Sequence, residues 1–180
     1  MKKFLIALLV VLQLLVAREN QELSEIYTEF TQTVTVKYSR TIKVRTKKAY
    51  SESNSVKDVV YFWNKINNQR DTNKLYYLYA PEVLYYGKNL KDSNCIKDKR
   101  KFYKKHPFFS QSIDNLYVVK LDDDLYKVYF DKYVRIKENG RVKKYPSYLV
   151  VGYVNGVPFI FVEGDSVTDR NLLKKYKKSH

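Results

Sequence analysis

The sequence has little cysteine, histidine and glycine. Cys95 is the only cysteine among 180 residues, which excludes an intramolecular disulfide and a cysteine-based metal site. The two histidines, His106 and the C-terminal His180, are too few to provide the ligands of a zinc site. The five glycines form neither a phosphate-binding loop nor a dinucleotide fingerprint. We therefore expect no metal and no cofactor, and a fold that depends on its hydrophobic core.

Acidic residues are also scarce relative to basic ones. The chain has 34 Lys and Arg against 19 Asp and Glu, a formal net charge of +15. Such a balance favours anionic surfaces such as headgroups and envelope polymers, although it can also serve solubility alone. No RNA- or DNA-binding motif accompanies the charge, so nucleic acid is not an expected partner.

The N-terminus, "MKKFLIALLVVLQLLVA", has the pattern of a secretory signal peptide over residues 1–17. Lys2 and Lys3 provide a charged start, and Phe4 to Val16 form an apolar stretch interrupted only by Gln13. This stretch is shorter than the roughly 20 residues of a transmembrane helix. We expect an exported protein, periplasmic or extracellular. An uncleaved signal anchor is the alternative and would be its only membrane contact.

Residues 18–54 are expected to form an N-terminal arm or linker. Alternate positions are apolar at Val34, Val36, Tyr38, Ile42 and Val44, which predicts a strand with one apolar face. The stretch "TKKAYSESNS" that follows is typical of a linker.

The compact domain is predicted over residues 55–169, followed by a basic tail, 170–180, that frays. Ser55 is a candidate N-cap of a first helix, whose apolar face is Val56, Val59, Val60, Trp63 and Ile66. A short helix over 74–79 should end at Pro81, followed by the strand "EVLYYG". A third helix, capped by Ser93 or Asn94, should end at Pro107. After Pro107, apolar and polar residues alternate as they do in strands, and turns are predicted at residues 122–124, at "ENG" and at "NG". Helices segregated from strands indicate an α+β fold.

This order resembles the NTF2-like superfamily, which includes nuclear transport factor 2 and the SnoaL-like and ketosteroid-isomerase-like proteins. The resemblance rests on "VVYFWNKINNQRD", "LYYLYAPEVLYYG" and "KFYKKHP", and on the strands "VYFDKY", "YPSYLVV" and "FIFVEGD". It implies a cone in which three N-terminal helices pack on a curved antiparallel sheet. It does not imply an activity, since the superfamily includes enzymes, binding proteins and assembly modules.

Two acids at the end of the last predicted strand are the first site candidates. Side chains two apart on a strand share a face, which places Glu163 and Asp165 with Phe159 and Phe161. Lys132 lies among apolar residues of a neighbouring strand, and a lysine there needs a carboxylate. We expect a structural ion pair of Lys132 with Glu163 or Asp165. An acid–base pair and a solvated strand end are the alternatives.

Catalytic candidates are weak. Asp71, His106, Asp131 and Glu163 could act in a small cofactor-free isomerase or hydrolyase only if at least two met in one cavity. We expect His106, at the end of a helix, to cap backbone carbonyls.

The chain has 18 tyrosines, and a Tyr side chain combines an apolar ring with a polar tip. A cone lined by Trp63, Tyr77, Tyr85, Phe130 and Phe161 could take up a peptide, an envelope polymer or a small apolar ligand. We therefore expect a non-catalytic binding or assembly module at the cell envelope. The alternatives are the small enzyme and a dimeric structural protein that pairs through an open sheet face.

Overall fold

The structure, a computed structural model, describes residues 2–46 and 55–180, with the backbone alone for residues 2–8, 44 and 46. Most of the predicted linker, residues 47–54, lies outside the described residues. The elements in chain order are α1 (Lys2–Thr46), α2 (Val56–Gln69), α3 (Thr72–Leu78), β1 (Tyr79–Tyr85), β2 (Lys88–Lys91), α4 (Asp92–Lys105), β3 (Ser110–Asp122), β4 (Leu125–Arg135), β5 (Lys143–Val154), β6 (Val157–Asp165) and α5 (Ser166–Ser179).

The strands form one six-stranded sheet in the order β2-β1-β6-β5-β4-β3. Neighbouring strands are antiparallel except for β1 and β6, which run parallel, so the sheet is mixed where we expected an antiparallel one. The predicted α+β class is confirmed.

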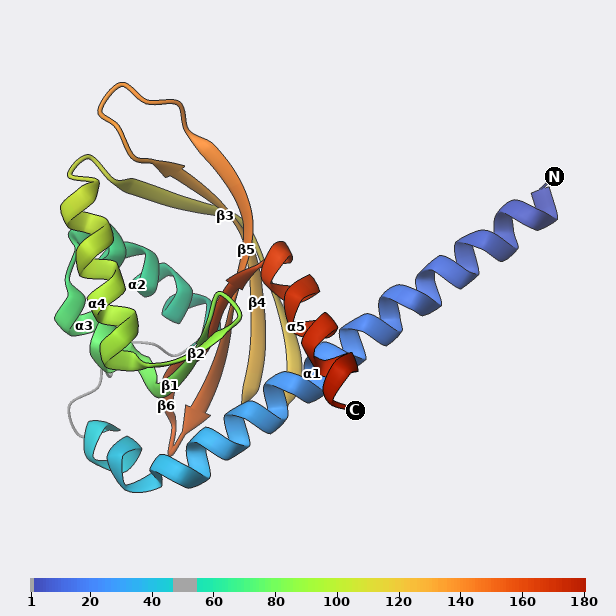
Figure 1. The fold of residues 1–180 in the computed structure, drawn as a ribbon, viewed down its shortest axis with the longest axis horizontal. Coiled ribbons are helices and arrows are strands. Elements are labelled where there is room, and N and C mark those ends of the chain that lie inside the picture. The colour runs from blue at the N-terminus through green and yellow to red at the C-terminus, as the bar shows by residue number, and fades with distance from the viewer. Residues whose placement is uncertain (1, 47–54) are drawn as a thin grey trace.

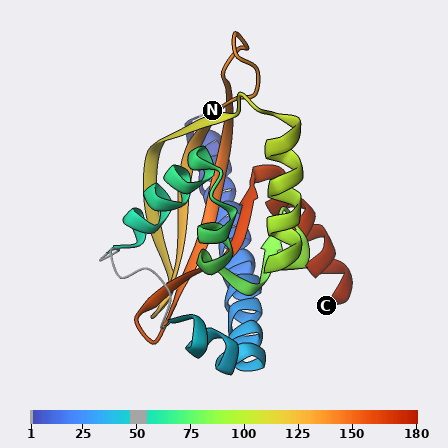
Figure 2. The ribbon, with the colours of Figure 1, turned by 90° about the vertical axis from the view of Figure 1, so that its left-hand side faces the viewer.

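Helices cover both faces of the curved sheet (Figure 1). α2, α3 and α4 lie on the concave face, and α1 and α5 lie on the opposite face. The view turned by 90° shows the same layers, with α1 running behind the sheet (Figure 2). Two hydrophobic clusters result: the inner core includes Trp63 and Phe130, and the outer core includes Tyr27, Tyr148 and Phe161.

The inner helices follow from local sequence signals. Ser55 caps α2 through its side chain, and the five predicted apolar positions of this helix are buried. α4 begins after Lys91, which makes no side-chain cap, so the predicted caps Ser93 and Asn94 were wrong. Pro81 lies inside β1 instead of ending a helix, and β2 was not predicted.

The predicted strand near residue 34 was wrong, because this segment belongs to the long helix α1. The buried residues Leu23, Tyr27, Val34 and Ile42 recur at helical intervals and face the sheet. Val36, expected on the same face, is 79% exposed. Burial of one helical stripe outweighs the strand preference of the Val and Thr residues. The helix is kinked at Tyr38.

The C-terminal segment is helix α5 where we expected a frayed tail. Asp165 caps it by accepting the N–H groups of Val167 and Thr168, and Leu172 and Leu173 are buried. α5 packs beside α1 over the outer sheet face, where β5 is buried from residue 147 to residue 152. The outer sheet face, which the alternative of a dimeric structural protein takes to be open, therefore carries these two helices.

A buried lysine ties the outer layer together. Lys127 lies 3.2 Å from Asp169 of α5 and over the rings of Tyr27, Tyr129 and Tyr148. The hydroxyl of Tyr27 in α1 donates to Asp169 at 2.7 Å. At its other end, α1 is held by the buried ion pair of Arg45 with Asp92. In the described helices, no stretch is long and apolar enough to cross a membrane.

Candidate functional site

A β-bulge in β6 turns Glu163 into the cone. β5 residues Val150 and Val151 pair with Val162 and Ile160, which leaves Phe161 as an extra residue. An extra residue reverses the alternation of side chains beyond it. Phe159 and Phe161 therefore face the outer core, whereas Glu163 faces the inner helices. The expectation that these three side chains share one face was wrong for this reason.

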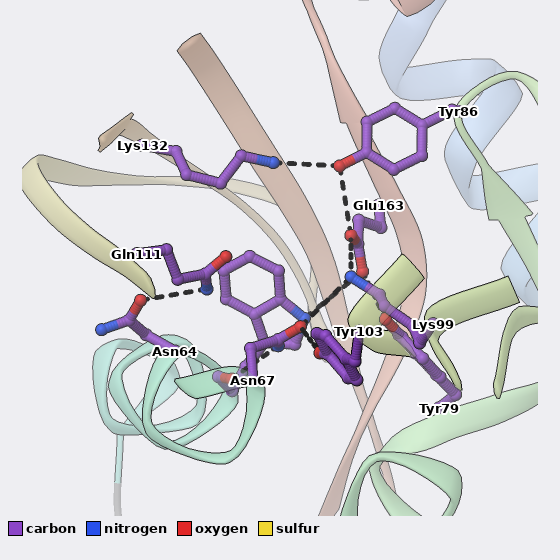
Figure 3. A network of polar contacts seen from close by, with 10 residues as sticks. Asn64, Asn67, Tyr79, Tyr86, Lys99, Tyr103, Gln111, Lys132 and Glu163 are labelled. Carbon is purple, nitrogen blue, oxygen red and sulfur yellow. Dashed lines mark hydrogen bonds and ion pairs between the residues drawn. The ribbon is translucent and has the colours of Figure 1, made fainter. Parts of the chain in front are cut away.

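The Glu163 carboxylate is buried and accepts hydrogen bonds on both oxygens (Figure 3). Oε2 accepts from the indole of Trp63 at 3.3 Å and from the hydroxyl of Tyr79. Oε1 accepts from the hydroxyl of Tyr86 at 3.2 Å and from the ammonium of Lys99 at 2.8 Å. A carboxylate that accepts this many donors is fixed in position and in charge.

Two lysines flank this carboxylate from different elements. Lys99 of α4 forms the ion pair with Glu163 and also donates to Asn67 at 3.2 Å. Lys132 of β4 donates to the hydroxyl of Tyr86 at 3.0 Å and forms no ion pair with any described carboxylate. Figure 3 shows the resulting chain from Lys132 through Tyr86 and Glu163 to Lys99.

This arrangement shifts the pKa values of the groups that it brings together. Burial alone would raise the pKa of Glu163, but the charges of Lys99 and Lys132 and the donated hydrogen bonds hold it below its usual range. Burial lowers the pKa of Lys132 to about 8, since the attraction of Glu163 only partly offsets it. Burial beside Glu163 raises the pKa of Tyr79 and Tyr86, which therefore remain hydrogen-bond donors.

A pocket of about 380 Å³ opens beside the two lysines, between α4 and the sheet. Its wall is mostly aromatic and aliphatic, and its polar groups are two lysines, two amides, two acids and the hydroxyls of four tyrosines. Asp165 is engaged as the cap of α5, and Asp98 is exposed. The pocket is lined by Asn67, Tyr85, Tyr86, Asp98, Lys99, Phe102, Tyr103, Phe109, Gln111, Lys132, Val134, Ile136, Tyr145 and Asp165.

The four catalytic candidates do not meet in one cavity. Asp71 caps α3, and Asp131 forms an ion pair with Lys144 at 2.8 Å. His106 occupies the C-cap position of α4, where its backbone N–H donates to the carbonyl of Phe102, and its ring lies 4.8 Å from that of Phe102. Only Glu163 lies in the cone. Among the described residues, no group of His, Cys, Asp and Glu side chains is placed to hold a metal ion.

Only Tyr85 of the predicted pocket residues lines the pocket. Trp63 and Phe130 are packed against each other in the inner core, with ring centroids 5.7 Å apart. Phe161 faces the outer core because of the bulge, and Tyr77 is half-buried against Tyr76.

The predicted ion pair has a different cation. Glu163 pairs with Lys99, and Lys132 reaches it only through Tyr86. Sequence reasoning missed Lys99, although it stands among the apolar positions of the α4 pattern beside Ile96 and Tyr103. A lysine on an apolar helix face was the signal that could have identified it.

Comparison with known proteins addresses the fold. No protein-family model and no curated protein matches the chain. An NTF2-like protein of unknown function from Pseudomonas putida matches with a TM-score of 0.52 and 11% identity, over 61% of this chain and 81% of that one. The protein has the NTF2-like fold. An NTF2-like family member from Streptomyces avermitilis matches with a TM-score of 0.51 and 10% identity, over 61% and 91% of the two chains.

Bd1075 of Bdellovibrio bacteriovorus matches with a TM-score of 0.51 and 14% identity over 61% of this chain. The match spans only 39% of the Bd1075 chain. At these identities the likeness concerns the fold alone, so the function has to be argued from the pocket.

Proposed function

We propose that this NTF2-like protein is a non-catalytic binding module whose cone pocket takes up small carboxylates with an apolar body. The observation that carries the proposal is Lys132, a half-buried ammonium in an apolar pocket that has no carboxylate partner among the described residues. An unpaired charge in such surroundings is costly, and an anionic ligand would remove the cost.

Donor counting supports an anion at this position. Each ammonium has three N–H donors. Lys132 uses one on Tyr86, and Lys99 uses two on Glu163 and Asn67, which leaves three donors between them. Of the other two acids at the pocket, Asp165 is engaged as the cap of α5 and Asp98 is exposed, so Glu163 is the one buried carboxylate beside the two lysines.

The pocket walls favour an apolar body on that anion. Phe102, Phe109 and Val134 provide ring and methyl surface in the lining, and the more exposed Ile136 and Tyr145 add to it. The volume of about 380 Å³ lies at the lower end of the range of small-molecule sites, roughly 300 to 1,000 Å³. An aryl-substituted propionate has the matching size and polarity.

The state of Glu163 supports binding over acid–base catalysis. A catalytic base needs a pKa near the working pH and an unengaged oxygen. Glu163 has a lowered pKa, and both of its oxygens accept hydrogen bonds from buried or half-buried groups. Its role in the proposal is to position Lys99 and to hold Tyr86 toward Lys132.

The proposal places this module outside the cytoplasm, as the signal-peptide pattern of residues 1–17 suggests. N-terminal sequencing of the protein from fractionated cells tests this. A mature chain that begins at Arg18 in the exported fraction supports export. A full-length chain in the cytoplasmic fraction would contradict it.

Calorimetric titration with 3-phenylpropionate tests the binding function. We expect binding of the carboxylate, at least tenfold weaker binding of the neutral isostere 3-phenylpropanol, and at least tenfold weaker carboxylate binding by Lys132→Met. Lys132→Arg, which keeps the charge, should retain most of the affinity. Lys120→Met is the matched control, since Lys120 is an exposed strand lysine. Equal affinity for the acid and the alcohol, or an unaffected Lys132→Met, would refute an anion site.

A further inference from the structure

Lys132 differs from every other described lysine. Among the described residues only Lys99, Lys127 and Lys132 are lysines that the fold does not leave exposed. Lys99 is engaged by Glu163 at 2.8 Å and Lys127 by Asp169 at 3.2 Å. Lys132 alone combines partial burial, a position in the pocket and the absence of an ion pair.

We propose that Lys132 reversibly captures the carbonyl group of small oxo carboxylates as a Schiff base. This inference rests on the proposed anion site and narrows its ligand class to acids that also carry a ketone or aldehyde. Lys99 remains a cation beside the pocket, with one donor unused, and can hold the carboxylate of the captured molecule.

Capture needs a neutral amine, and the pocket favours one. A lysine becomes nucleophilic when it is desolvated or placed near another cation. Both conditions apply to Lys132: burial lowers its pKa to about 8, and the charge of Lys99 contributes in the same direction. At pH 7 its neutral fraction exceeds that of a lysine with the ordinary pKa by roughly two orders of magnitude.

The chemical step is balanced within the site. The amine nitrogen attacks the carbonyl carbon, and the π electrons of the C=O bond move to oxygen, which takes up a proton. The hydroxyl of the resulting carbinolamine takes up the second proton of the nitrogen, the C–O bond breaks and water leaves, and the nitrogen lone pair forms the C=N bond. Nothing is oxidised or reduced. The hydroxyl of Tyr86, 3.0 Å from the amine nitrogen, is placed to carry the proton from nitrogen to oxygen.

Borohydride trapping with phenylpyruvate tests the proposal on the full chain. Reduction converts the C=N bond into a stable secondary amine, which peptide mass spectrometry assigns to a particular lysine. At pH 7 we expect at least tenfold more adduct on Lys132 than on exposed lysines such as Lys120. Phenyllactate, which has a hydroxyl in place of the carbonyl, should compete for the site and form no adduct.

Two variants separate this inference from the proposed function. Lys132→Arg keeps the positive charge and should still bind phenyllactate, but it should form no adduct at this position. Tyr86→Phe keeps the amine and should form the adduct several-fold more slowly. Binding of phenyllactate without trapping of phenylpyruvate at Lys132 would overturn the Schiff base and leave the anion site standing. Failure of both acids to bind would overturn both proposals. Adducts spread evenly over the surface lysines would also refute a specific site.

Discussion

Replacing Glu163 by glutamine removes the charge at the centre of the inner layer and keeps the shape of the side chain. The two carboxylate oxygens accept from four donors, two on each oxygen. A glutamine can offer only one oxygen, and its amide NH₂ would face two of these donors. Either Lys99 and Tyr86 or Trp63 and Tyr79 would then lose their acceptor.

The expected cost follows from these contacts. A hydrogen bond to a charged group contributes about 1.5–3 kcal/mol, so the loss of two gives about 3–6 kcal/mol. Removing one partner of a buried ion pair costs about the same amount. With a urea m-value of about 2 kcal/mol per M, the midpoint should fall by about 2 M without a change in m.

Urea unfolding followed by circular dichroism measures this loss, and its pH dependence adds a second readout. The folded-state pKa of Glu163 lies below its unfolded value, so its contribution is fully present above pH 4.5 and is lost as the pH falls through the folded pKa. The difference between wild type and Glu163→Gln should therefore shrink as the pH falls below 4.5.

A double-mutant cycle with Lys99→Met checks the pairing itself. We expect the double variant's loss in the free energy of unfolding to be about 1–3 kcal/mol smaller than the sum of the losses of the two single variants. Glu82→Gln is the matched control, because Glu82 pairs with the exposed Lys37 and should cost less than about 1 kcal/mol. A loss below about 1 kcal/mol for Glu163→Gln, or strict additivity with Lys99→Met, would refute a charge-based inner network.

Three further predictions concern other parts of the molecule. Deletion of residues 1–17 should change the free energy of unfolding by less than about 0.5 kcal/mol in a urea titration, because the apolar side chains of residues 9–16 are largely exposed. A decrease in the free energy of unfolding above about 1.5 kcal/mol would contradict this. Lys132→Met should be more stable than wild type at pH 7, and urea titrations should show this difference in the free energy of unfolding narrowing by pH 9.5. The reason is that the folded-state pKa of Lys132 is depressed, so the wild type gains stability as the pH rises from about 8 towards 10.5; a difference independent of pH would count against the lowered pKa of Lys132. Asp169→Ala should cost about 3 kcal/mol by leaving Lys127 buried without a partner, and adding Lys127→Met should restore most of it; no recovery would show that the cost arises elsewhere.

Much of the fold was predictable because its signals are local. The cap and the apolar positions of α2 and the turns between strands needed no tertiary information. The helix α1 was missed although Leu23, Tyr27 and Val34 already show its interval. Val34 and Ile42 lie eight residues apart, which fits both a strand and about two turns of helix. Only the sheet that these residues cover decides between the two.

The site was less predictable because it depends on a register shift. Glu163 was identified as a candidate, but strand alternation placed it on the face of Phe161. One extra residue in β6 reverses that assignment, and nothing in the run "FIFVEGD" marks where it occurs. The same shift removes Phe161 from the cone and brings Glu163 to Lys99, so one irregularity explains both errors.

The two lysines of the cone have different explanations. Lys99 is accounted for by stability, since it neutralises Glu163 and satisfies Asn67. Lys132 is only partly accounted for in this way: its hydrogen bond goes to a neutral hydroxyl, and the attraction of Glu163 offsets only part of the cost of its burial. A residue whose burial costs more than its contacts return is what a binding site requires of its recognition group. This difference, rather than the NTF2-like fold, is why the proposals for this protein are centred on Lys132.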